Sequence, residues 1–257
     1  MNLRAAALLL ALPFLSKAAF SAELPVGSCL APQAMTDLSQ CDFTRMTLAG
    51  KDLHGVRLAG AKMESADFRN ANLAGSDFRG SNAKWANFTG ADLSAADLRN
   101  ADLFHATFDD AILTDANLVG AYLFGANLIK AHAVRADFSS AYLKDILMEG
   151  IDLSGGSIRN CYGLRGVFTG GKLVGADLSG ADLTGAAMEE VDFTDAKLAA
   201  TRLSGATLRH AIFFRADMQD ANLENADVWN ANFDKARNRN DSVQDALVEP
   251  FVVRDRR

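Results

Sequence analysis

The chain has few of the residues that carry most enzyme chemistry, with four histidines and three cysteines among 257 residues. The histidines are His54, His105, His132 and His210, and no two of them have the spacing of metal ligands. None has an evident cysteine or carboxylate partner for a catalytic triad, and the sequence lacks both a Cys-x-x-Cys motif and a phosphate-binding glycine loop. We therefore expect a protein that is not an enzyme and that binds no metal or cofactor.

The sequence also lacks an apolar run long enough to cross a membrane, which takes about 20 residues. A shorter apolar run, residues 5–15, follows Arg4 and precedes the small residues Ala19 and Ser21. A positive residue, a short apolar stretch and small residues are typical of a cleaved signal peptide. We expect cleavage near Ala22, so that residues 1–22 are a signal peptide. The mature protein is then periplasmic or secreted, without a transmembrane segment.

Two other interpretations of this terminus remain open. The apolar run could stay attached as an anchor. Residues 26–29 loosely resemble a lipoprotein box that ends at Cys29, although Lys17 and Glu23 separate it from the apolar run.

What the sequence does have is a five-residue repeat. Large apolar residues occupy every fifth position from Phe43 to Phe233, over 39 consecutive units, except at Ala83, Ala133 and Gly163. The residue two positions earlier is usually small and is Ala in 25 units, and the residue between them is Asp in 14 units and Asn in 7. A period of five fits neither an amphipathic helix nor a half-buried strand, but a short fixed repeat is the signature of a solenoid.

Segments such as Ala91–Ala95 and Ala176–Gly180 resemble the pentapeptide-repeat family, whose unit reads Ala-(Asp/Asn)-(Leu/Phe)-x-x. The resemblance covers about three quarters of the chain. It implies an all-β fold, a right-handed quadrilateral β-helix with four units per coil, so that residues 20 apart stack. At a strand spacing of about 4.8 Å, about ten coils form a rod on the order of 45 Å long.

The small, inward column offers an internal check on this geometry. Ile146 and Ile151 are too large for the column, and 20 residues later the same columns hold Gly166 and Gly171, the second continuing with Val191. Large against small along a column indicates volume compensation between stacked coils. Coincidence in a glycine-rich stretch is the alternative.

The two ends are expected to be covered, because open coil ends would pair with other molecules. We assign residues 23–40 to an N-terminal cap, 41–235 to the β-helix, and 236–257 to a C-terminal cap helix and tail. Export predicts a disulfide between Cys29 and Cys41 that pins the N-terminal cap, whereas Cys161 falls in the small inward column. Asp241 or Ser242 is expected to cap a helix that runs through Val248 before Pro250 ends it. The resemblance implies that this end could carry a homodimer interface.

The outward positions are mostly polar, with one exception. The three tyrosines of the chain lie 20 residues apart, between the small and the central residue, and aromatic residues occupy neighbouring columns. The candidate interaction face consists of Trp85, Phe104, His105, Tyr122, Phe124, Tyr142, Lys144, Tyr162 and Arg165. An exposed aromatic patch rimmed by cations is typical of a binding site. Two alternatives are that the tyrosines only stabilise the coils, or that a cap segment covers them.

The same part of the chain is the least regular. Gly163 replaces a central Leu and leaves a gap between Leu143 and Leu183, which indicates either a void or a local bulge that turns Leu164 inward. A bulge would remove Leu164 from the patch.

We interpret the chain as an exported scaffold that binds an unidentified protein or an envelope glycan through this face. The resemblance implies an alternative, because some pentapeptide-repeat proteins mimic DNA and act on DNA gyrase. The net charge of −6 disfavours binding of nucleic acid itself. Mimicry of DNA requires a cytoplasmic protein and a dense negative stripe, whereas Arg57 and Lys197 interrupt the most acidic column and Arg79, Arg99 and Arg159 run beside it.

Overall fold

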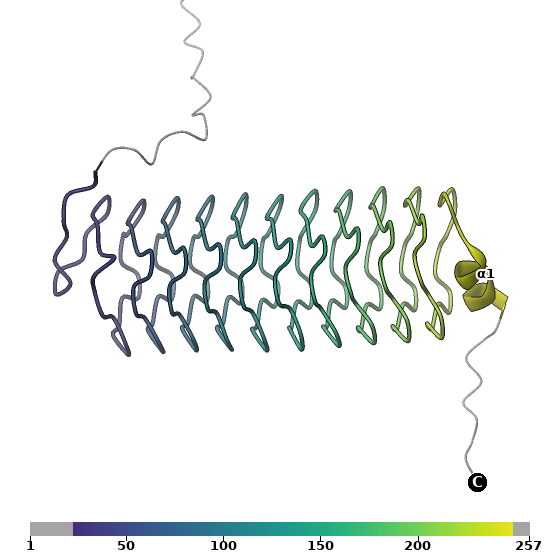
Figure 1. Cartoon of the computed structure of the whole chain (residues 1–257), viewed down its shortest axis with the longest axis horizontal. Coiled ribbons are helices and arrows are strands. Elements are labelled where there is room, and N and C mark those ends of the chain that lie inside the picture. Colours follow the sequence, from purple (N-terminus) through teal and green to yellow (C-terminus); the bar gives the residue numbers. More distant parts are fainter. Residues whose placement is uncertain (1–22, 249–257) are drawn as a thin grey trace, which may run out of the picture.

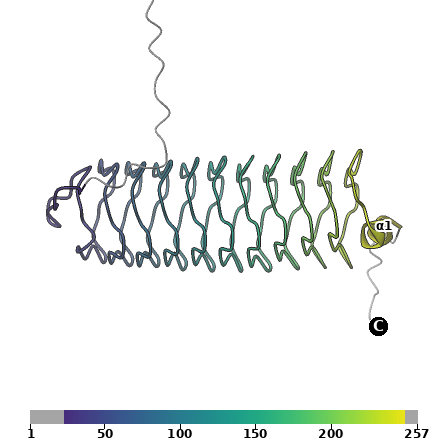
Figure 2. The same ribbon diagram turned by 45° about the horizontal axis from the view of Figure 1, so that its top comes forward.

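The computed structural model describes residues 23–248, which form one straight stack of coils (Figure 1). The coils follow one another in sequence order from the purple N-terminal end to a short helix at the yellow C-terminal end. Turned by 45°, the coils keep a similar outline along the rod (Figure 2). The predicted signal peptide and the residues after Val248 lie outside the described residues.

Each coil takes 20 residues. Parallel β-bridges join residues 20 apart, from Asp37 with Arg57 to Asp217 with Arg237. On either side of each bridge, backbone hydrogen bonds join one coil to the next. For example, the amide of Leu48 donates to the carbonyl of Asp67 at 2.7 Å. Each side of the coil pairs through a single bridge residue, because a turn follows within two residues. The β-structure is therefore a set of isolated bridges rather than long strands.

The corners recur every five residues. The amide of Ala66 donates to the carbonyl of Met63 at 3.0 Å, and this turn bond is repeated along the chain. The last residue of each unit has a positive φ at every fifth position from Arg45 to Lys235. Gly120 shows why glycine is frequent there: its φ is 68°, and an added Cβ would lie 2.6 Å from the side-chain oxygen of Asn100. Four such corners in 20 residues make the coil quadrilateral.

The interior is filled by the central Leu and Phe of each unit. Phe68, Phe88 and Phe108 are fully buried and stack at centroid distances of 5.1 and 4.8 Å. We call these three residues the phenylalanine ladder. Each buried side chain of this size stabilises the fold by roughly 1.5–3 kcal/mol relative to an exposed one. One continuous core therefore holds the coils together.

The volume compensation expected in the small column is present. A Cβ on Gly166 would lie 3.2 Å from Cγ2 of Ile146, and one on Gly171 would lie 3.4 Å from Cγ2 of Ile151. The isoleucines therefore occupy space that a larger residue in the next coil would need. These close approaches argue against coincidence.

Gly163 marks neither a bulge nor an open void. Its amide donates to the carbonyl of Asp182 at 2.8 Å, so the ladder of bonds continues without a bulge. A Cβ on Gly163 would lie 2.9 Å from Cδ2 of Leu183, which therefore leans into the space. The alternative that turned Leu164 inward is wrong: Leu164 stays at an outward position and is half-buried.

At the N-terminal end, Val26 forms a parallel bridge with Asp37 and adds a segment to the first coil. Cys29 and Cys41 form a disulfide, with their Cα atoms 5.4 Å apart. Leu38 is already part of the core, so the stacked register begins inside the segment that we assigned to the cap.

At the C-terminal end, α1 spans Asp241–Val248. Asn240 caps this helix rather than Asp241 or Ser242, because its Oδ1 accepts a hydrogen bond from the amide of Val243 at 3.3 Å. The hydroxyl of Ser242 instead donates to the carbonyl of Ala221 in the last coil. Val243 is fully buried, so the helix covers part of the open core. Among residues 23–248, no helix has the length and apolar character that a membrane span needs.

Candidate interaction face

The three tyrosines form a ladder on the outside of the rod. The ring centroids of Tyr122 and Tyr142 lie 4.9 Å apart, and those of Tyr142 and Tyr162 lie 5.1 Å apart. The interplanar angles are 19° and 26°, so the rings stack nearly face to face. We call these residues the tyrosine ladder. The repeat places them there because residues 20 apart bridge directly.

Two phenylalanines in the neighbouring column extend the ladder. The rings of Phe104 and Phe124 stack at 5.6 Å, and each also stacks on a tyrosine: Phe104 on Tyr122 and Phe124 on Tyr142, both at 6.3 Å. These five rings lie at outward positions of consecutive coils, and together they form a continuous aromatic strip.

The rings of Trp85 and His105 lie nearly perpendicular to the rings of the strip, at its N-terminal end. The Trp85 ring is inclined by 82° to Phe104, and the His105 ring by 86° to Phe104 and 81° to Phe124. A Cβ on Gly125 would lie 2.4 Å from the imidazole of His105, so the glycine leaves the space that this ring occupies.

The strip is accessible to a partner. Trp85 is 49% exposed, and Tyr122 and Tyr162 are each 39% exposed. Neither the N-terminal segment from residue 23 nor α1 covers these side chains. The structure therefore contradicts the cap alternative for the described residues.

The charges around the strip are largely paired with one another. Lys84 pairs with Asp102 at 3.1 Å, and Arg165 pairs with Asp145 at 2.7 Å. Lys144 is different: its Nζ lies 5.9 Å from the centroid of the Phe124 ring, and it forms no ion pair among residues 23–248. The structure therefore brings all nine expected residues into one region, which we call the aromatic face, with one unpaired ammonium at its centre.

Two smaller groups lie near the C-terminal end, at neighbouring corners of the coil, and were not expected. The imidazole of His210 stands at 85° on Trp229, with centroids 4.8 Å apart, and Arg215 and Lys235 lie over the ring of Phe214 at 4.7 and 5.2 Å. The sequence signal was weak, because these residues come from different columns of the repeat.

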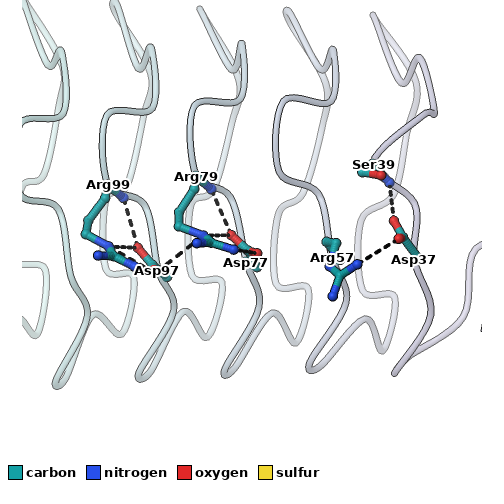
Figure 3. Close-up of polar contacts among 7 residues, drawn as sticks. All are labelled: Asp37, Ser39, Arg57, Asp77, Arg79, Asp97 and Arg99. Carbon is teal, nitrogen blue, oxygen red and sulfur yellow. Dashed lines mark hydrogen bonds and ion pairs between the residues drawn. The ribbon is translucent and has the colours of Figure 1, made fainter. Parts of the chain in front are cut away.

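The most acidic side of the rod is neutralised along part of its length (Figure 3). Two nitrogens of Arg79 donate to the carboxylate of Asp77 at 2.7 and 2.8 Å, and Arg79 also reaches Asp97 at 3.7 Å. Burial raises the pKa of Asp77, but the bonds from Arg79 outweigh this and hold that pKa below its usual value. Arg99 pairs with Asp97 in the same way. This side therefore presents alternating charges rather than a negative stripe.

The remaining candidates for chemistry stay isolated. Nδ1 of His54 lies 2.8 Å from Asp52, a partner that the sequence did not reveal, but both side chains are exposed. Burial, followed by the nearby Asp182, raises the pKa of the Cys161 thiol to about 12, so this cysteine stays protonated and unreactive. Within residues 23–248, no group of three or more His, Cys, Asp or Glu side chains could hold a metal ion.

The model of the pentapeptide repeats family matches this chain in eight copies, over residues 36–75, 65–103, 84–118, 116–155, 167–198 and 192–230. The chain therefore belongs to the pentapeptide-repeat family, whose members fold as right-handed quadrilateral β-helices and are generally non-enzymatic structural or binding proteins. No curated protein is significantly similar to it.

Several solved structures are similar to this chain, among them those of HetL and QnrB1. HetL, a pentapeptide repeat protein involved in heterocyst differentiation regulation in the cyanobacterium Nostoc sp. strain PCC 7120, is 31% identical. That match covers 76% of this chain and 90% of HetL, with a TM-score of 0.48. A trypsin-treated variant of QnrB1, a plasmid-mediated fluoroquinolone resistance protein, is 19% identical over 80% of this chain and 97% of its own, with a TM-score of 0.61. The likeness to QnrB1 shows the fold alone.

Proposed function

We propose that this protein is an exported, non-enzymatic scaffold that binds a protein or glycan partner through the aromatic face. The observation that carries the proposal is the exposed tyrosine ladder, because aromatic residues dominate the energetics of many interfaces. The apolar run at residues 5–15 supports export, and the disulfide between Cys29 and Cys41 is compatible with an oxidising compartment.

The test of export is fractionation of the native host. We expect the protein in the periplasm or the culture supernatant, and N-terminal sequencing should begin near Ala22 or Glu23. An intact mass should be lower by two hydrogens for the disulfide. A cytoplasmic protein that keeps Met1 and reduced thiols would contradict export.

The test of the binding face is a pull-down from the periplasm or supernatant with two matched variants. The first replaces Tyr122, Tyr142 and Tyr162 with Ser. The second replaces three aspartates on another face, Asp97, Asp137 and Asp177, with Asn, which removes charge but can keep the turn hydrogen bonds that these side chains accept. We expect the tyrosine variant to lose most partner binding, by about 2 kcal/mol or more for each anchor ring, and the aspartate variant to keep it.

The alternative function is mimicry of DNA toward DNA gyrase, which the fold shared with QnrB1 allows. The ion pairs of Asp77 and Asp97 with Arg79 and Arg99 argue against it, because they leave little unbalanced negative charge on that side. A supercoiling assay with purified DNA gyrase tests this alternative: an effect of the protein on gyrase that the aspartate variant loses and the tyrosine variant keeps would favour the mimic.

A further inference from the structure

The rings of the tyrosine ladder turn their inner faces toward one another. Both faces of Tyr142 are covered, by Tyr122 at 4.9 Å and by Tyr162 at 5.1 Å, and Phe104 stacks on Tyr122. The accessible part of Tyr142 is therefore the rim of the ring and its phenol hydroxyl. A ligand that must lie flat on an aromatic ring, as a sugar ring would, finds the inner faces of this ladder occupied.

The accessible ring edges and Lys144 are electropositive. An aromatic ring carries its negative potential on the face and its positive potential on the edge, whereas the phenol hydroxyls can both donate and accept hydrogen bonds. Lys144 adds a full positive charge beside the ladder, and it has no carboxylate partner among residues 23–248. The neighbouring charges of Lys84 and Arg165 are already compensated by Asp102 and Asp145. Asp145 lies near Lys144 as well, but it pairs with Arg165, so these three cations exceed the two carboxylates by one positive charge.

We infer that the aromatic face docks an acidic polypeptide segment, with a carboxylate over Lys144 and apolar side chains along the rims of the tyrosine ladder. The inference rests on the proposed function and names the class of its partner. Charge complementarity selects an acidic partner. The covered ring faces, together with the apolar side chains of Phe104, Phe124 and Leu164, favour a peptide over an acidic glycan.

The experiment is selection of random dodecapeptides from a display library on the immobilised mature protein, with the triple Tyr→Ser variant as the counter-selection. We expect the enriched peptides to be acidic and to carry apolar or aromatic residues. The best peptide is then titrated against Lys144→Glu and against Lys172→Glu, the same charge reversal on the opposite side of the coil. Lys144→Glu should weaken binding by about 10-fold or more, and Lys172→Glu by less than about 2-fold.

Replacement of Glu and Asp by Gln and Asn in the best peptide should also lose about 10-fold in affinity. A chitin oligosaccharide and a polyuronate are titrated in parallel, and tighter binding of either through the tyrosines would overturn the inference. Enrichment of basic or neutral peptides, or no enrichment, would overturn it as well. In these cases the proposed function still stands if the tyrosine variant loses its partner in the pull-down, and it fails only if that variant keeps the partner.

Discussion

The phenylalanine ladder and the tyrosine ladder have the same geometry on opposite sides of the backbone. Phe68, Phe88 and Phe108 stack at 5.1 and 4.8 Å inside the coil, and the tyrosines stack at 4.9 and 5.1 Å outside it. The phenylalanines are fully buried, whereas two of the tyrosines are 39% exposed. A one-residue difference in the position within the unit decides which side a ring occupies. Stacking is thus common to both ladders, and burial is what separates a core from a surface.

The largest effect is expected from a truncation in the phenylalanine ladder. Phe88→Ala leaves a cavity between two stacked rings, so we expect a loss of about 3–5 kcal/mol in the free energy of unfolding. Tyr142→Ala, the equivalent truncation in the outer ladder, should cost about 1 kcal/mol because it removes stacking but opens no cavity. Chemical denaturation measures both. Equal losses would mean that the tyrosine ladder stabilises the fold as a core does.

The second prediction tests the assignment of inward and outward positions. Ala126 and Ala131 are fully buried, so enlarging either to Leu should cost about 1–3 kcal/mol through overpacking. Ser139→Leu, at an outward position, should cost about 0.5 kcal/mol or less. The comparison uses denaturation midpoints of the three variants, and similar values for all of them would contradict the quadrilateral coil.

The third prediction tests whether the tyrosine ladder, unlike the phenylalanine ladder, contributes little to the stability of the fold. Replacement of all three tyrosines with Ser removes the two stacks within the ladder and the two longer ones with Phe104 and Phe124. We expect a loss of about 1–2 kcal/mol with an unchanged circular dichroism spectrum. The variant should therefore be folded in the binding experiments. A loss of several kcal/mol would instead make the ladder a structural element, and the interaction proposal would fail.

The smallest effect is on the pH dependence. The pKa of Asp77 is lower in the folded protein than its usual value, so its carboxylate stabilises the fold above the unfolded pKa, and this stability is lost as the pH falls through the folded value. Asp77→Asn should lower the melting temperature at pH 7, and the difference from the unchanged protein should shrink below about pH 4. Tyr142→Ser removes no carboxylate, so its effect should not change over the same range. If the difference in melting temperature between Asp77→Asn and the unchanged protein grew in acid, the lowered pKa of Asp77 would be contradicted.

The sequence predicted which residues share a column better than it predicted which individual side chains touch. It placed Tyr122, Tyr142 and Tyr162 in one column, because the repeat has no insertion and the family resemblance implies that residues 20 apart stack. It did not reveal that His54 meets Asp52, or that Leu183 fills the space beside Gly163. These contacts depend on rotamers and on the packing of neighbouring coils, which a period of five does not specify.

The five-residue period in the sequence determined which positions point inward and which outward, because it leaves only one register for burying the central Leu and Phe. The resemblance to the pentapeptide-repeat family added the four units per coil, and with them the membership of the aromatic face. Only the tertiary structure decided how the exposed groups are oriented. It stacks the tyrosine rings on one another, so that both faces of Tyr142 are covered, and it leaves Lys144 without an ion-pair partner among the described residues. It also places Asn240, and not Asp241, at the start of α1. These features depend on contacts between residues of adjacent coils and on the chain end, where the repeat no longer constrains the backbone.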